Sequence, residues 1–337
     1  MVHYSNRNKI KPKQKRPPRA PPSASDESPT VEQATPLPEE PRAFEMKEIP
    51  GKGIGLLAVR DLKAGDLVLR EAPILITEGR TTGDVVFKAY SKLSQSDKEA
   101  FDSLYCEEFT PRLPRFMGIL KTNAIEVGVE EEGKVGVFVQ GSRFNHSCSA
   151  NVRKTWDLTE GVEWFIAMKD IKEGDELTQS YRDPRQKREK RKESLRAGYG
   201  FDCTCQVCSM DSERVTVSDG RREKIKELSQ STQALILKDP LKLVRNVKLA
   251  LSLMEEEGVL EGRADLAFEC LGVCAFYGDR FNTNRWIDKT LELDRYEGGI
   301  WSSRYRQMKS WKGQPTRHPG WNSIAAKSGA RTLLGPK

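Results

Sequence analysis

The chain has 337 residues, 37% of them hydrophobic and 31% charged, which is enough for one large domain or two ordinary ones with a sizeable core. It contains no run of about 18 apolar residues, which argues against a membrane-spanning helix. The seven cysteines are an odd number, and the basic N-terminal stretch lacks the apolar core of a secretory signal. Both features predict reduced thiols in the cytosol or the nucleus.

The formal charge of +7 is unevenly distributed along the chain. Residues 1–19 and 301–337 hold 15 of the 56 Lys and Arg and no acid, which leaves 41 basic against 49 acidic residues between them. The body of the chain is therefore acidic, and it lacks the gathered basic residues of a nucleic-acid-binding domain. We expect no direct reading of nucleic acid, and a basic peptide is a better partner for such a body.

The first elements in chain order are a loose arm and two strands. Residues 1–42 are basic and proline-rich and then rich in Ser, Pro and Glu, a composition that predicts a disordered arm. From Gly51 onward, IGLLAV and LVLREAPILI flank the turn KAGD and predict two strands of a hairpin or meander. Pro73 predicts that the second strand ends there or lies at an edge.

Helical spacing of aromatic and aliphatic residues between 84 and 108 predicts two short amphipathic helices within a helical insertion at about 80–121. Strand patterns return in NAIEVGV, KVGVFV and VEWFIAM. After Asp211 the period is helical again and predicts a small domain of three or four antiparallel helices over 211–300. Residues 301–337 are basic and rich in Gly, Pro and Ser, so we expect a flexible tail.

The glycine-rich stretch GKGIGLLA at 51–58 does not fit a dinucleotide-binding fingerprint, because Leu56 takes the third glycine position and a strand follows. Closely spaced glycines that lead into a strand let the backbone approach a ligand, or form an ordinary flexible turn.

Three cysteines in FDCTCQVC, at positions 203, 205 and 208, suggest a closed structural zinc site, which takes four ligands. Three buried core thiols are the alternative, but polar residues interrupt the run. The fourth ligand is open among Cys148, Cys106, Cys270, Cys274 and the histidines. Cys270 and Cys274 lie four residues apart on a predicted helix, so core packing is the favoured role for them.

Further candidate residues lie in NHSCSANV at 145–152, GDELTQSY at 174–181 and RQKREKRK at 185–192. His146 and Cys148 could form a nucleophilic pair or half of a metal site, and the compartment argues against glycosylation of N-H-S. Tyr181 follows a strand, where a tyrosine often only packs. The basic run could be a nuclear localisation signal or the solvated face of a helix.

Taken in order, GKGIGLLA, NHSCSAN, GDELTQSY and YGFDCTCQVC resemble the SET domain of protein lysine methyltransferases, closest to the SET and MYND family. The resemblance covers about residues 44–210, and the helical part resembles the helical repeat domain of that family. It implies an α+β fold with a β-rich SET domain over 43–182, a zinc-binding post-SET segment over 183–210 and an all-α domain after it. We expect no MYND zinc finger, because that module alone needs more Cys and His than the chain has to spare. Ala150 replaces the usual Pro, a departure that we expect to be tolerated.

The resemblance also implies two cofactors, S-adenosylmethionine and Zn²⁺, and methylation of a lysine in a basic segment of a histone or another protein. It assigns S-adenosylmethionine binding to Lys52, Gly53, Ile54, Asn123, Asn145, His146, Tyr199 and Phe201. It assigns zinc to Cys148, Cys203, Cys205 and Cys208, and catalysis to Tyr181. We expect a monomer in the nucleus, the cytoplasm or both.

Two other functional classes fit parts of the pattern. A SET-like module could bind peptides with little catalysis, although the presence of Asn145, His146 and Tyr181 argues against it. A hydrolase could use His146 and Cys148, but a thiolate held by zinc cannot also be a nucleophile. The zinc site and the hydrolase therefore exclude each other.

Overall fold

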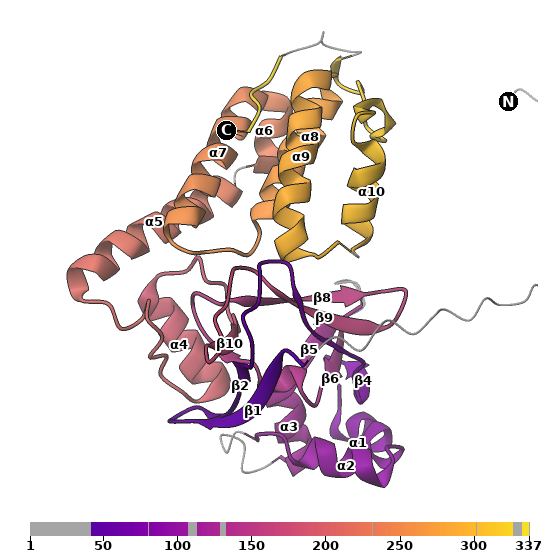
Figure 1. The fold of residues 1–337 in the computed structure, drawn as a ribbon, viewed down its shortest axis with the longest axis vertical. Coiled ribbons are helices and arrows are strands. Elements are labelled where there is room, and N and C mark those ends of the chain that lie inside the picture. Colours follow the sequence, from indigo (N-terminus) through magenta and orange to yellow (C-terminus); the bar gives the residue numbers. More distant parts are fainter. Residues whose placement is uncertain are drawn as a thin grey trace, which may run out of the picture. The chain divides into compact units, whose positions relative to one another are not determined.

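A computed structural model describes residues 42–79, 81–106, 113–128, 133–230, 232–300, 302–325 and 332–336. Residues 42–337 make up one compact unit, and the predicted disordered arm lies almost entirely outside the described residues. The fold is α+β, with a strand-rich part followed by a helical part (Figure 1). Within these ranges, none of the helices combines the length and the apolar character needed to cross a bilayer.

The first sheet brings together three of the sequence motifs. Its strands run in the order β1 (Phe44–Ile49), β2 (Gly53–Ala58), β10 (Glu176–Gln179) and β7 (Asn145–His146). Strand β10 pairs antiparallel with β2, opposing Leu177 to Leu56, and parallel with β7, opposing Thr178 to Asn145. The glycine-rich stretch and the Asn–His pair therefore flank the strand that leads to Tyr181.

Two three-stranded sheets complete the strand-rich part. One has the order β3 (Leu67–Glu71), β9 (Val162–Ala167) and β8 (Val152–Asp157), and the other β4 (Leu75–Glu78), β6 (Lys134–Val137) and β5 (Ile125–Val127). Pro73 lies between β3 and β4, as predicted for a strand end. The expected hairpin or meander is wrong, because β2 pairs with β1 and β10 while β3 pairs with β9. These partners lie far away in the sequence, so local pattern does not reveal them.

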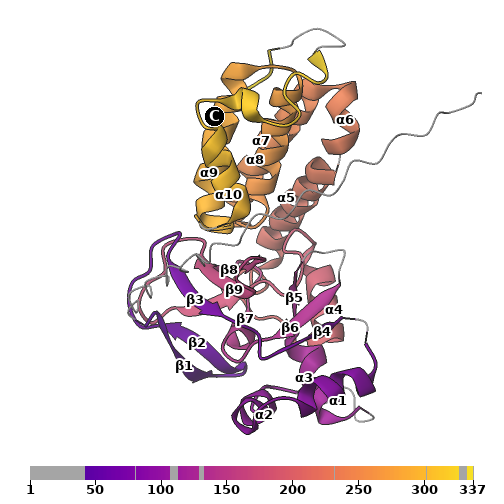
Figure 2. The same cartoon turned by 90° about the vertical axis from the view of Figure 1, so that its right-hand side faces the viewer.

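The helical insertion contains α1 (Gly83–Ser91), α2 (Gln95–Asp102) and a third helix, α3 (Arg115–Asn123), which the pattern did not predict. Ser94 caps α2 by accepting a hydrogen bond from the backbone N–H of Asp97 at 3.1 Å. The apolar faces of these helices bury Phe101 and Ile119 against Leu75 and Val137 of the third sheet. Figures 1 and 2 show α1 and α3 beside β4 and β6, and α2 contacts α3.

The chain then forms α4 (Arg188–Tyr199) and, in the described residues up to 300, five more helices where three or four were expected. They are α5 (Ser212–Gln230), α6 (Thr232–Lys238), α7 (Pro240–Glu256), α8 (Arg263–Phe276) and α9 (Arg280–Glu297). Asp239 and Asp279 cap α7 and α9 through the backbone N–H groups of Lys242 and Asn282. Cys270 and Cys274 are fully buried in this core, as favoured from their spacing, and burial raises the pKa of both thiols.

The expectation of a flexible tail after residue 300 is wrong for the described part of that segment. Helix α10 (Ser303–Trp311) buries Met308 and Trp311 in the helical core. Near the C-terminus, Leu333 is 2% exposed, and the indole N–H of Trp286 donates to the Leu334 carbonyl at 2.9 Å. The basic, glycine-rich composition of this segment predicted flexibility, because only a few of its residues are apolar and buried.

Candidate active site and metal centre

Four cysteines from two distant segments converge. Cys148 follows β7, and Cys203, Cys205 and Cys208 lie in the loop after α4. All four sulfurs lie within 4.8 Å of one another, with Cys148 Sγ 3.6 Å from Cys208 Sγ and 4.0 Å from Cys203 Sγ. Tetrahedral zinc with Zn–S bonds of about 2.3 Å places its sulfurs about 3.8 Å apart. The donor set and its spacing fit a structural zinc ion.

The other cysteine candidates for the fourth ligand, and His318, lie elsewhere. The Cys106 thiol faces the Arg115 carbonyl in the helical insertion, Cys270 and Cys274 lie in the helical core, and the His318 ring packs on Phe276. Only Cys148 joins the three clustered cysteines among the described Cys, His, Asp and Glu side chains.

The proton balance of the four thiols also suits a bound cation. Hydrogen bonds from neighbouring thiols raise the pKa of Cys148 and lower the pKa values of Cys205 and Cys208, that of Cys208 to about 7. Four thiols this close share protons, because they cannot all carry a charge together in a buried site. A divalent cation would allow all four to ionise.

The His146 ring connects this cluster to Tyr181. Its Nδ1 accepts a hydrogen bond from the backbone N–H of Tyr181 at 3.0 Å, and its Nε2 lies 3.3 Å from Cys148 Sγ. Burial lowers the pKa of His146 to about 4, so the ring is neutral at pH 7. A neutral imidazole has one donor and one acceptor nitrogen, so the proton lies on Nε2 and points at the sulfur.

This tautomer argues against the Cys–His hydrolase. A general base would have to accept the Cys148 proton through Nε2, which already carries a proton because Nδ1 is the acceptor. Both ring nitrogens are engaged within the protein. Any contact of His146 with a bound cofactor would therefore come from its backbone or its carbon atoms.

A small polar network lies next to β7. The Asn145 amide donates to Glu176 Oε1 at 3.0 Å, and Lys52 Nζ lies 2.5 Å from Glu176 Oε2. The Asn145 side chain also approaches Gly55 of β2, where a Cβ would lie 2.6 Å from the Asn145 amide nitrogen. The network joins the β1–β2 turn to β7 through β10.

The glycine-rich stretch GKGIG is the β1–β2 hairpin turn and the start of β2. Gly51 and Gly53 both have φ of +73°, a left-handed conformation that favours glycine. The backbone N–H of Lys52 closes the turn on the Ile49 carbonyl at 2.9 Å, and Ile54 is 43% exposed beside it. The turn therefore leaves backbone and an apolar side chain open for contact with a ligand.

Tyr181 lies in a cluster of aromatic rings. Its hydroxyl donates to the Phe144 carbonyl at 2.7 Å, and its ring centroid is 4.8 Å from that of Tyr199 and 6.5 Å from that of Phe201. Burial raises the pKa of Tyr181, so the hydroxyl stays protonated. Because the proton points at Phe144, the oxygen lone pairs are directed away from that carbonyl and can accept a hydrogen bond. The Arg182 guanidinium covers the Tyr199 ring at 4.9 Å.

The side chain of Asn123 belongs neither to the polar network beside β7 nor to the aromatic cluster at Tyr181. Its amide nitrogen donates to the carbonyls of Tyr105 at 2.7 Å and Ile119 at 2.8 Å, at the end of α3. The residue is 8% exposed. Both amide hydrogens therefore hold the helical insertion together.

Two charged residues near the site were missed from the sequence. Glu71 accepts hydrogen bonds from the backbone N–H groups of residues 139, 140 and 141, and so holds the segment that enters β7. Arg191 belongs to the basic run, yet it is 1% exposed and donates to Cys148 Sγ at 3.3 Å. Its spacing of four residues from the buried Leu195 was the only available signal.

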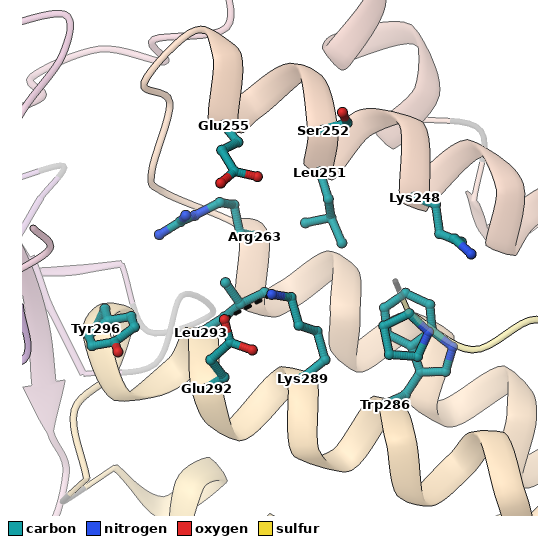
Figure 3. A pocket seen from close by; sticks show the side chains of 11 residues that line it. Lys248, Leu251, Ser252, Glu255, Arg263, Trp286, Lys289, Glu292, Leu293 and Tyr296 are labelled. Carbon is teal, nitrogen blue, oxygen red and sulfur yellow. Dashed lines mark hydrogen bonds and ion pairs between the residues drawn. The ribbon is translucent and has the colours of Figure 1, made fainter.

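A cavity of about 210 Å³ lies in the helical part, away from these residues. Figure 3 shows charged side chains of α7, α8 and α9 around it, with Leu251, Leu293 and Trp286 as its apolar lining. None of the residues assigned to cofactor, metal or catalysis lines this cavity. It contributes nothing to the candidate active site.

Comparisons with known proteins agree with this arrangement. The SET domain model matches residues 53–182. Histone-lysine N-methyltransferase set5 of Schizosaccharomyces pombe is 27% identical over 285 residues, covering 83% of this chain and 87% of that protein. The putative SET domain-containing protein L678 of Acanthamoeba polyphaga mimivirus is 29% identical over 197 residues, covering 48% of this chain and 75% of that protein. N-lysine methyltransferase SMYD2 of Gallus gallus is 32% identical over 127 residues, covering 37% of this chain and 28% of that protein.

The matched segment begins at β2 and ends one residue after Tyr181, so it spans the first sheet except β1. This chain carries a SET domain. Over most of its length it resembles SET-domain lysine methyltransferases, as the order of its four motifs indicated.

Proposed function

We propose that the protein transfers a methyl group from S-adenosylmethionine to the side-chain amine of a lysine in a protein substrate. The observation that carries the proposal is the position of Tyr181. Its neutral hydroxyl, fixed by the Phe144 carbonyl, lies in an aromatic cluster, and its backbone binds His146 next to Asn145. A polar network for a charged cofactor thus lies close in the fold to an apolar lining for an alkyl amine.

The residues of the first sheet fit a cofactor of this kind. When bound, S-adenosylmethionine would supply an electrophilic methyl group on a positively charged sulfur. Asn145 and the backbone of the turn at Lys52, Gly53 and Ile54 would hold it, with Tyr199 and Phe201 as apolar walls. Glu176, held by Asn145 and Lys52, places a carboxylate beside the cofactor residues.

The substrate lysine has to be neutral to react, and a free lysine has a pKa of about 10.4. Poorly solvated aromatic surroundings disfavour the charged ammonium, so the amine would release its proton to solvent on entering the site. The Tyr181 oxygen would accept a hydrogen bond from the amine and align it. Held in this way, the neutral amine would be the nucleophile for the methyl group that the cofactor supplies, and methyl transfer of this kind depends mainly on alignment.

We propose one zinc ion per chain, bound by Cys148, Cys203, Cys205 and Cys208. A closed four-thiolate site has no open position for substrate, so its role is structural. The clustered cysteines follow Tyr199 and Phe201 directly, while Cys148 follows Asn145 and His146. The metal would therefore fix the aromatic walls relative to the cofactor strand.

The acidic body of the chain supports a lysine within a basic segment as the substrate, and a nuclear or cytoplasmic location gives access to such proteins. The alternative is a SET-like module that binds peptides without turnover. The test is transfer of labelled methyl from S-adenosylmethionine to a histone mixture and to a proteome extract, followed by mapping of the modified residue. We expect label on lysines in basic segments.

Absence of label from every substrate, with cofactor and peptides still bound, would favour the binding module. Equal activity on matched acidic and basic peptides would contradict the proposed substrate class while leaving methyl transfer intact.

A further inference from the structure

Arg191 is a buried cation in contact with the cysteine cluster. It lies on α4 and is 1% exposed. Its Nε donates to Cys148 Sγ at 3.3 Å, its Nη2 lies 3.9 Å from Cys208 Sγ, and its Nη1 donates to the Gln186 carbonyl. A guanidinium removed from water is strongly destabilising unless its N–H groups meet acceptors and its charge meets an anion.

The cluster would supply that anion once it holds a metal. Zn²⁺ with four thiolates carries a net charge of −2, and thiolate sulfurs are much better acceptors than thiols. Cys148 Sγ then accepts two hydrogen bonds of 3.3 Å, one from Arg191 and one from His146 Nε2. This sulfur belongs to the ligand that is most distant in sequence from the other three.

The first helix of the helical part holds Arg191 in place. Asp219 of α5 accepts the backbone N–H of Arg188 at 2.8 Å, at the first residue of α4, and its Oδ1 lies 3.9 Å from Arg191 Nη1. Lys187 is the N-cap residue of α4, and its side chain makes no capping hydrogen bond. The Asp219 carboxylate of α5 caps the helix in its place. The position of α5 is thereby connected to the cysteines through one arginine.

We propose that Arg191 is a positioning residue of the metal centre, which retains zinc by neutralising part of the thiolate charge and fixing Cys148 and Cys208. This proposal rests on the proposed zinc site. The competing interpretation is that the buried Arg191 side chain only packs beneath α4. Its contacts with the sulfurs would then have no effect on the metal.

Arg222 provides a matched control for that interpretation. It is equally buried, at 0% exposed, and its guanidinium binds the Pro184 carbonyl, Ser218 and Glu257. Arg222→Lys should therefore cause a comparable loss of stability without removing a donor to sulfur.

The test uses the full chain purified with zinc, as wild type, Arg191→Lys, Arg191→Gln and Arg222→Lys. Zinc content is measured by elemental analysis, and zinc release by the rate of transfer to a chromogenic chelator. We expect zinc to leave both Arg191 variants about tenfold faster or more than wild type, as for other residues that hold metal ligands. Arg222→Lys should release zinc at the wild-type rate.

A second measurement does not depend on stability. In protein loaded with Co²⁺ instead of zinc, the thiolate-to-cobalt charge-transfer band reports hydrogen bonding at the sulfurs. It should shift in Arg191→Lys and Arg191→Gln and stay in place in Arg222→Lys.

The proposal would be overturned if the Arg191 variants released zinc at the same rate as Arg222→Lys and had their cobalt charge-transfer band at the same position. If Arg191→Gln does not fold, Asp219→Asn replaces it as a milder change, with faster release again expected and a wild-type rate counting against the role of α5. A wild-type protein without zinc would refute the metal site itself. That outcome differs from zinc-loaded protein in which Arg191 has no effect.

Discussion

The backbone N–H of Tyr181 donates a hydrogen bond to Nδ1 of His146 over 3.0 Å. The opposite nitrogen of the same ring lies 3.3 Å from Cys148 Sγ. One buried, neutral imidazole therefore connects the proposed catalytic residue to the proposed metal centre. Changes at the cysteines should consequently be felt at the cofactor and substrate sites.

Cys203→Ser should lose zinc and S-adenosylmethionine binding together. Loss of the metal would free the segment that carries Tyr199 and Phe201 from the loop after His146. Elemental analysis and calorimetric titration with the cofactor measure the two losses. Cys106→Ser, in the helical insertion, should keep both. A zinc-free Cys203→Ser protein with full cofactor affinity would break the proposed coupling.

Asn145→Ala and His146→Ala should each weaken S-adenosylmethionine binding while the fold is kept. The first change removes the donor that holds Glu176, and the second leaves the Tyr181 N–H without its acceptor, at a stability loss of about 1–3 kcal/mol. Calorimetry measures the affinity and circular dichroism the fold. Unchanged affinity in both variants would mean that this strand has only a structural role.

Gly55→Ala should reduce both stability and cofactor affinity. The added Cβ would lie 2.6 Å from the Asn145 amide nitrogen and 2.7 Å from Ile49 Cγ1, so the side chains of Asn145 and Ile49 would have to move. Gly220→Ala, in α5, is the control, because its Cβ would meet no described atom within 4 Å beyond the nearby backbone of its own helix. This change should stabilise the protein by about 0.5–1 kcal/mol. Thermal unfolding and cofactor titration measure the two effects. A Gly55→Ala protein with normal melting temperature and affinity would contradict the close approach.

Glu163→Gln should make the protein less sensitive to alkaline pH. Burial raises the pKa of Glu163 to about 8, above its usual value of 4.5, and its Oε2 atom has no hydrogen-bond partner among the described residues. Because this pKa is raised in the folded state, the contribution of Glu163 to stability is fully present below pH 4.5 and is lost as the pH rises to about 8. Wild type should lose about 3 kcal/mol relative to Glu163→Gln between pH 6 and pH 9. Denaturant unfolding of both proteins at several pH values measures this difference. If the free energy of unfolding changed equally with pH in the two proteins, a buried, protonated Glu163 would be excluded.

Much of the candidate site could be predicted from the sequence, because its residues lie in short motifs. The three cysteines within six residues indicated a metal, the family resemblance implied Cys148 as the fourth ligand, and the structure brings the four sulfurs together. Pro73 marked the end of a strand, because it cannot donate to a neighbour. The long helical segments after residue 211 were recognisable from their period.

Other features depend on contacts between distant segments and could not be predicted. The pairing of β2 with β10 joins residues more than a hundred positions apart. The burial of Arg191 depends on sulfurs and on Asp219, which the charge pattern of its own helix does not indicate. The C-terminal segment contacts the helical core partly through Trp286 of α9, whose indole N–H donates a hydrogen bond to the Leu334 carbonyl 48 residues further along the chain.

Single-turnover methyl transfer by Tyr181→Phe, measured beside cofactor affinity, is the most direct test of the proposed mechanism. The change removes only the hydroxyl, so transfer should fall about a hundredfold or more while S-adenosylmethionine affinity stays close to wild type. Tyr277→Phe is the control, since it removes another buried hydroxyl, which donates to the Ile236 carbonyl in the helical core, and should transfer normally. Near-normal transfer by Tyr181→Phe would contradict the account and reduce Tyr181 to a packing residue.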